Sequence, residues 1–226
     1  MKVLDLTHII SEGMPVYPGT KPPTLKPAST YGKDGFRETL LTMFSHTGTH
    51  MDAPAHLFAG KSTLDQFPVS QFVGRALVIE CKELKEGESI TMEHVSHYGE
   101  KAEKADFLLF HLGWDQRWGA EDYFNDYPCV EDEVIDFVLE TGKKGIGFDV
   151  IGIDPVYDLE LPRHKRLFQT NQIMVVLVVT SPIFANKNHF IKALLQKHPD
   201  ITTVLMNVNT KFASMVLGER ETVLYG

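Results

Sequence analysis

The distribution of hydrophobic residues along the chain predicts a β-sheet. Apolar runs at residues 74–80, 107–111, 145–153 and 173–179 have the length and composition of buried strands. A looser alternation between residues 36 and 45 also favours β-structure. Shorter strands are expected at residues 2–6 and 202–208.

Helical patterns lie between these runs, at residues 91–104, 131–141 and 188–197. Thr91 is a suitable N-cap for the first helix, and Gly142 ends the second. Strands and helices mix without a strict alternation, and neither an internal repeat nor a linker divides the chain. We therefore expect a single domain, residues 1–226, of mixed α/β class.

Residues 12–33 are rich in proline and glycine and predict a long, stiff surface loop. Tyr17 and Tyr31 lie in this loop. Two interpretations stay open: the loop forms one wall of a substrate pocket, or it packs against a partner in an oligomer.

Composition narrows the class of protein. The 226 residues are 43% hydrophobic with a net charge of −8, which fits a globular protein and disfavours nucleic acid as a partner. Cys81 and Cys129 form no C-x-x-C pair, which suits a reducing, cytoplasmic setting. Asp5 interrupts any signal peptide, and the run at 173–179 is too short to cross a membrane, so no membrane partner is expected.

The chemically informative segment is residues 46–56, where His46, His50, Asp52 and His56 fall close together. Imidazole nitrogens and a carboxylate oxygen are ligands that suit Zn²⁺ or Mn²⁺. Gly48 and a nearby proline argue against a helix, so we expect a tight loop in which the glycine lets the two rings converge. A neighbouring threonine or a backbone carbonyl would orient each ring.

This segment, His46-Thr-Gly-Thr-His50-Met-Asp52-Ala-Pro-Ala-His56, resembles the signature H-x-G-T-H-x-D-x-P-x-H of the cyclase-like metal-dependent hydrolases, the family of bacterial kynurenine formamidase and isatin hydrolase. The similarity extends over about residues 1–168. It includes residues 5–8 and 13–19, Leu112-Gly113-Trp114 with Trp118, residues 147–149 and 153–154, and His164.

The resemblance implies a swivelling β/β/α fold with a mixed sheet and flanking helices, assembled as a homodimer or larger homo-oligomer. It implies that His46, His50 and Asp52 hold a divalent ion. It makes His56 either a catalytic histidine or a ligand to a second metal, for which His164 is the distal ligand.

The chain departs from the family after His164. Family members carry a glutamate about twelve residues beyond the distal histidine, where this chain has Val176, and residues 173–187 contain no acid. Glu160 or Glu219 would have to supply a carboxylate from elsewhere. Residues 181–226 also look unlike the family, and one metal ion per chain is favoured over two because an anionic ligand is lost.

We therefore predict a hydrolase that uses metal-activated water to cleave a small-molecule amide C–N bond, in an N-formyl aryl amine or a cyclic amide. Zinc is favoured and manganese is the alternative. His56 would act as general base or acid. The competing hypothesis is a catalytically degenerate protein that binds a metal or small molecule on the same fold.

Asp149, Asp154, Trp114 and Trp118 are expected to have structural rather than catalytic roles. Asp149 is interpreted as a strand-end carboxylate and Asp154, which Pro155 follows, as a turn carboxylate. Trp114 and Trp118, four residues apart near a strand end, are expected in the core rather than against a substrate.

Overall fold

The computed structural model describes residues 5–170, 172–176, 204–208 and 220–225. The chain divides into two compact units, one of residues Ile10–Leu177 and one of Met1–Ile9 with Val178–Gly226. The expectation of one domain over residues 1–226 stays a prediction.

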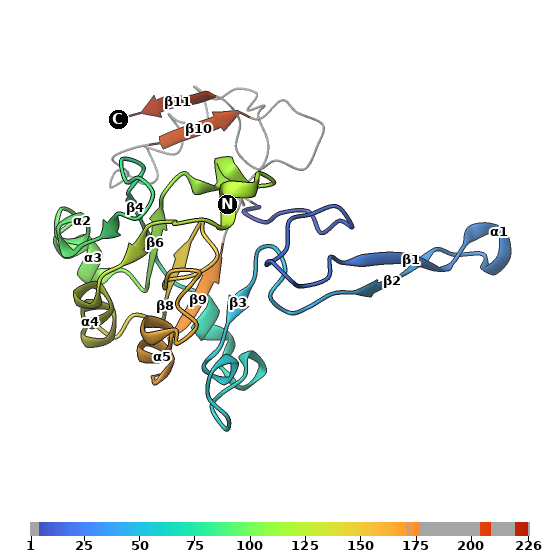
Figure 1. Cartoon of the computed structure of the whole chain (residues 1–226), viewed down its shortest axis with the longest axis horizontal. Helices are drawn as coiled ribbons and strands as arrows, with labels where there is room; N and C mark the ends of the chain where they lie inside the picture. Colours follow the sequence, from blue (N-terminus) through green and yellow to red (C-terminus); the bar gives the residue numbers. More distant parts are fainter. Residues whose placement is uncertain (1–4, 171, 177–203, 209–219, 226) are drawn as a thin grey trace. The chain divides into compact units, whose positions relative to one another are not determined.

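The larger unit is built on a five-stranded mixed sheet (Figure 1). Its strands follow the order β3, β9, β8, β6, β4, and all neighbours are parallel except β3 and β9. The bounds are β3 Met51–Asp52, β4 Ala76–Glu80, β6 Phe107–His111, β8 Gly145–Phe148 and β9 Ile173–Val176. The central strands β6 and β8 are largely buried, as the nearly continuous apolar sequence of each requires.

Helices α2 to α5 lie beside the sheet (Figure 1). Their bounds are α2 Met92–Ser96, α3 Glu100–Lys104, α4 Asp132–Glu140 and α5 Pro162–Phe168. Helix α4 buries Val134, Ile135 and Val138, whose spacing of three to four residues places them on one face. Phe110 of β6 stacks on Phe148 of β8 with ring centroids 5.1 Å apart, so the core lies against the central strands.

Shorter elements complete this unit. Strands β5 (Ser89–Ile90) and β7 (Cys129–Val130) form a two-stranded parallel sheet. The 3₁₀-helices are η1 Pro54–His56, η2 Leu64–Gln66, η3 Val69–Phe72, η4 Trp114–Arg117 and η5 Glu121–Phe124. The predicted mixed α/β class, with a mixed sheet and flanking helices, is confirmed.

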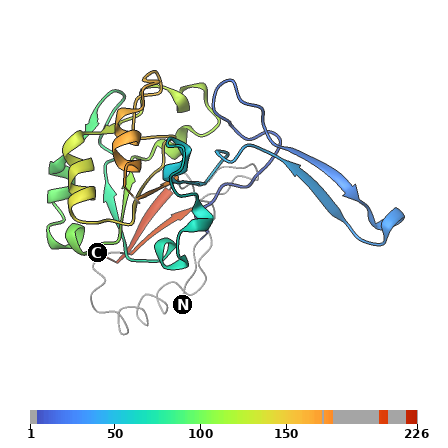
Figure 2. The same ribbon diagram turned by 90° about the horizontal axis from the view of Figure 1, so that it is seen from below.

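The predicted surface loop at residues 12–33 is wrong in its second half. Strands β1 (Thr24–Ser29) and β2 (Glu38–Thr42) pair as an antiparallel hairpin with α1 (Tyr31–Asp34) at its tip. Figure 2 shows this hairpin projecting away from the sheet. Pro27 is tolerated because the strand is at an edge and its register shifts between Pro27 and Ser29.

The helix predicted at residues 91–104 is two helices, because Gly99 adopts a φ of 49° between α2 and α3. The strand predicted at 145–153 ends at Phe148. The strand predicted at 173–179 is confirmed over Ile173–Val176, and residues 177–179 lie outside the described residues.

The smaller unit contains β10 (Val204–Val208) and β11 (Arg220–Tyr225), which pair in antiparallel fashion. The predicted strand at 202–208 is therefore confirmed over 204–208. The predicted helix at 188–197 lies outside the described residues, as do residues 2–4 of the predicted first strand, and Asp5 and Leu6 are not in a strand. Among the helices that the structure describes, none has the length and apolar character needed to cross a bilayer.

Candidate active site

His46 and His50 lie in a loop between β2 and β3, as predicted, whereas Asp52 lies in β3 and His56 in η1. Gly48 adopts a φ of +63°, a conformation that favours glycine. A Cβ at this position would also lie 2.8 Å from Cε of Met14, so the loop is closely packed. The turn at Gly48 brings His46 and His50 together, with their ring centroids 5.1 Å apart.

His46, His50 and Asp52, here called the His46 cluster, converge on one carboxylate oxygen. Oδ1 of Asp52 lies 2.7 Å from Nδ1 of His46 and 3.4 Å from Nε2 of His50. Asp52 is 5% exposed, and its Oδ1 is the oxygen that both imidazoles approach. One ligand atom from each residue lies within 4.8 Å of the others. Two imidazole nitrogens and a buried carboxylate oxygen fit a divalent metal ion.

A backbone carbonyl orients His50, which confirms the expected type of support. Nδ1 of His50 lies 2.7 Å from the carbonyl oxygen of Gly48, so the ring presents Nε2 to Asp52. Burial opposes a charge on His50, but Asp52 and the Gly48 carbonyl outweigh it and raise the pKa of His50. Burial would likewise raise the pKa of Asp52, yet the two imidazoles lower it, so the carboxylate stays ionised.

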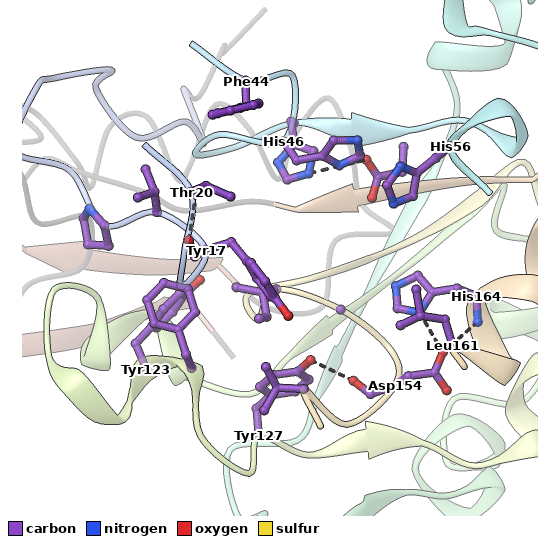
Figure 3. Close-up of a pocket in the computed structure, with 18 of the residues that line it drawn as sticks. Tyr17, Thr20, Phe44, His46, His56, Tyr123, Tyr127, Asp154, Leu161 and His164 are labelled. Carbon is purple, nitrogen blue, oxygen red and sulfur yellow. Dashed lines mark hydrogen bonds and ion pairs between the residues drawn. The ribbon is translucent and has the colours of Figure 1, made fainter. Parts of the chain in front are cut away.

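His56 and His164 line the same cavity but lie outside this compact group. The ring of His56, at the end of η1, is 4.0 Å from that of His46 between centroids. Burial lowers the pKa of His56, and the neighbouring His46 lowers it further. Figure 3 shows His46 and His56 on one side of the cavity and His164 on another. Helix α5 holds His164, which is buried.

Asp154 has a role that the sequence interpretation missed. Its Oδ2 lies 2.7 Å from Nδ1 of His164 and accepts the His164 backbone N–H at 2.9 Å. Its Oδ1 accepts the N–H of Arg163 at 3.1 Å. The assignment of Asp154 as a plain turn carboxylate is therefore wrong, because this buried group orients a histidine of the cavity. Its place ten residues before His164 was the available signal.

The cavity has a volume of about 400 Å³ and is lined by aromatic, aliphatic and polar side chains. Tyr17 lines it, which supports the pocket-wall interpretation for that residue, whereas Tyr31 is 72% exposed at the hairpin tip. Packing of residues 12–33 against a partner stays a prediction. Trp114 is a core residue as expected, but Trp118 lines the cavity. Phe124 also lines the cavity. So do Phe44, Tyr123 and Tyr127 (Figure 3).

Of the two glutamates considered as replacements for the family's carboxylate, Glu160 lies in the described part of the chain. Glu160 is exposed, pairs with Lys165 and does not line the cavity. Glu219 lies outside the described residues. The backbone of Val176 pairs with Phe148 at the end of β9, and the replacement of the family glutamate by Val176 stays a prediction.

Comparisons with known proteins show the family to which the chain belongs. Residues 4–155 match the family model described as "Putative cyclase". The kynurenine formamidase of Bacillus cereus is 31% identical over 168 residues, which cover 74% of this chain and 77% of that protein. The chain belongs to the cyclase-like hydrolase family.

Solved structures agree on the fold. A structure of an isatin hydrolase bound to the product analogue thioisatinate aligns with a TM-score of 0.66 at 21% identity, covering 95% of this chain and 88% of that one. A predicted metal-dependent hydrolase from Bacillus stearothermophilus aligns with a TM-score of 0.62 at 26% identity, covering 80% and 90%. These likenesses confirm the fold predicted from the histidine signature.

Proposed function

We propose that the protein is a metal-dependent hydrolase that cleaves the carbon–nitrogen bond of a small amide, either an N-formyl aryl amine or a cyclic amide. The observation that carries this proposal is the convergence of His46, His50 and Asp52 at the edge of a cavity lined in part by aromatic side chains. The relatives named kynurenine formamidase and isatin hydrolase support the same class of reaction.

In this proposal the His46 cluster holds one divalent ion, zinc or manganese. When bound, such an ion lowers the pKa of water from about 15.7 to about 7 and polarises a carbonyl group. The carbonyl of Gly48 fixes the ring of His50, and the buried Asp52 contributes the negative charge. We favour one ion per chain, because the second site would contain His56 and His164 without the family's glutamate.

His56 moves the proton in this scheme. It lines the cavity beside His46, and a neutral imidazole both accepts a proton from water and returns it to a leaving amine. Tyr17, Phe44 and Trp118 supply flat apolar surface against which an aromatic amide packs and from which water is excluded.

Metal content and turnover test the proposal together. Full-length protein is stripped with a chelator, refilled with Zn²⁺ or Mn²⁺, and analysed for metal per chain and for hydrolysis of formanilide and isatin. We expect the refilled protein to be active and the stripped protein inactive. His50→Ala removes metal and turnover, whereas His97→Ala, an exposed histidine, serves as the matched control.

The competing hypothesis, a degenerate binding protein, makes a different prediction. In that case the refilled protein holds its ion but hydrolyses neither amide, and Val176→Glu creates activity. Full turnover in the His50→Ala variant would contradict the metal-dependent mechanism itself.

We also propose that the chain assembles as a homodimer and works in the reducing cytoplasm. The hairpin exposes Leu40, Leu41 and Phe36, of which Leu40 is 58% exposed, and such apolar surface suits packing against a second copy. Cys81 and Cys129 are buried free thiols. Sedimentation of the protein and of a Leu40→Lys variant tests the assembly: a dimer should give way to a monomer.

A further inference from the structure

A second group of ligand-bearing side chains lies outside the cavity lining. It comprises His111, Asp115 and Asp149, here called the His111 cluster. His111 ends β6, Asp115 lies in η4, and Asp149 directly follows β8. Because β6 and β8 are parallel neighbours, their carboxyl ends meet at one edge of the sheet. One ligand atom from each residue lies within 4.8 Å of the others.

Asp115 is the unexplained member of this cluster. It is 6% exposed, yet neither of its carboxylate oxygens has a hydrogen-bond partner among the residues that the structure describes. A carboxylate removed from water without a partner is costly, so native proteins satisfy such groups with a donor or an ion. The unsatisfied oxygens of Asp115 therefore point to a ligand.

Asp149 is fixed in place by the backbone. Its Oδ1 accepts the N–H of Leu112 at 2.9 Å and its Oδ2 accepts the N–H of Trp114 at 3.0 Å. Each carboxylate oxygen has a second lone pair, so these two bonds leave acceptor capacity at Asp149. The residue is 7% exposed and held rigidly beside Asp115.

His111 is oriented in the way that metal-binding histidines are. Its Nδ1 lies 3.0 Å from Oε1 of Glu80, on the neighbouring strand β4. This contact fixes the ring and leaves Nε2 as the nitrogen free to ligate. The cluster thus has one imidazole and two carboxylates, with an outer carboxylate behind the imidazole.

The two buried carboxylates need a compensating positive charge or a proton. Asp115 is 6% exposed and Asp149 is 7% exposed, and one ligand oxygen of each lies within 4.8 Å of the other. A divalent cation between the two would satisfy both carboxylates at once.

We propose that the His111 cluster is a second metal site, which binds a divalent transition-metal ion through one imidazole nitrogen and two carboxylate oxygens, with water completing the coordination. This site is separate from the proposed hydrolytic centre. Its ion would tie the loop after β6 to the end of β8. Trp114 in that loop donates its Nε1–H to the carbonyl of Tyr123 at 3.0 Å, and Tyr123 lines the main cavity, so the ion would stiffen one cavity wall.

A cobalt titration measures metal binding at the His111 cluster separately from the His46 cluster. The background is the full chain with His46→Ala and His50→Ala, which removes two ligands of the His46 cluster. After chelation, Co²⁺ is added while visible absorption and bound metal are measured. We expect one equivalent with ligand-field bands, and a rise in Tm of about 5–10 °C at a hundredfold excess over Kd.

Asp115→Asn added to this background should remove the bound equivalent and the rise in Tm. Asp65→Asn, the same change at an exposed carboxylate, should retain both. If circular dichroism shows that the Asp115→Asn protein is unfolded, His111→Gln replaces it with the same expectation.

Two results would overturn the proposal. A background protein that binds no Co²⁺ would mean that Asp115 and Asp149 share a proton instead. An equivalent that survives the cluster substitution would place the metal elsewhere. Because hydrolysis is not measured, a failure of the proposed hydrolase activity leaves this test unaffected.

Discussion

The His46 cluster and the His111 cluster have similar side chains but are assembled in different ways. His46, His50 and Asp52 lie within seven consecutive residues, and a single loop with a glycine turn brings them together. His111, Asp115 and Asp149 come from the ends of two parallel strands and become neighbours only when the sheet forms. A site built by one loop leaves a pattern in the sequence, whereas a site built by strand pairing does not.

The largest expected effect is on catalysis and follows substitution at the His46 cluster. Asp52→Ala removes the buried anionic ligand, and loss of several kcal/mol of charge stabilisation should lower kcat/KM for the amide substrate about 10³-fold or more. Steady-state kinetics measure this, with Asp65→Ala as the control. An active Asp52→Ala enzyme would remove the His46 cluster from catalysis.

At the His111 cluster, the expected effect of a substitution is on the stability of the fold. Asp149→Ala leaves the buried N–H groups of Leu112 and Trp114 without their acceptor, which should cost about 2–5 kcal/mol of unfolding free energy. Urea denaturation measures the change. An effect below about 0.5 kcal/mol, the range of ordinary surface substitutions, would mean that the loop after β6 is held by other contacts.

The far side of the main cavity is also assembled by tertiary structure. Asp154→Asn weakens the support of His164, and outer groups of this kind are worth about 10–100-fold in metal affinity or activity. We expect a fall of that size in kcat/KM with unchanged circular dichroism. Asp126→Asn is the exposed control, and equal rates in the two variants would show that His164 needs no such support.

The smallest expected effect on catalysis follows from crowding the ring of His164 at Gly152. A Cβ at Gly152 would lie 3.1 Å from Cε1 and 3.3 Å from Nε2 of that ring, so Gly152→Ala should displace it by a few tenths of an ångström. Because misplacement by 1 Å costs about 10²-fold, we expect a loss of about tenfold or less. Gly32→Ala, with open space around its Cβ, is the matched control, and identical kinetics would contradict a constrained ring.

The fold was predictable where the local pattern is strong. The apolar runs of β6 and β8 and the amphipathic face of α4 follow from periodicity alone, and these elements lie where they were expected. Strand β2 lies within the β-structure expected at residues 36–45, but its partner β1 was not predicted, because proline and glycine are typical of loops. The two strands form only because each supplies the other's hydrogen bonds.

The sequence by itself determined the family and the His46 cluster, because the three ligands lie within seven residues and the turn between two of them is made by Gly48. Tertiary structure alone decided the rest of the site. It buried Asp154 against His164, drew Tyr17 and Trp118 to one cavity, and placed Asp115 beside Asp149. Strand pairing and core packing join residues far apart in the chain, and the spacing of residues does not encode such contacts.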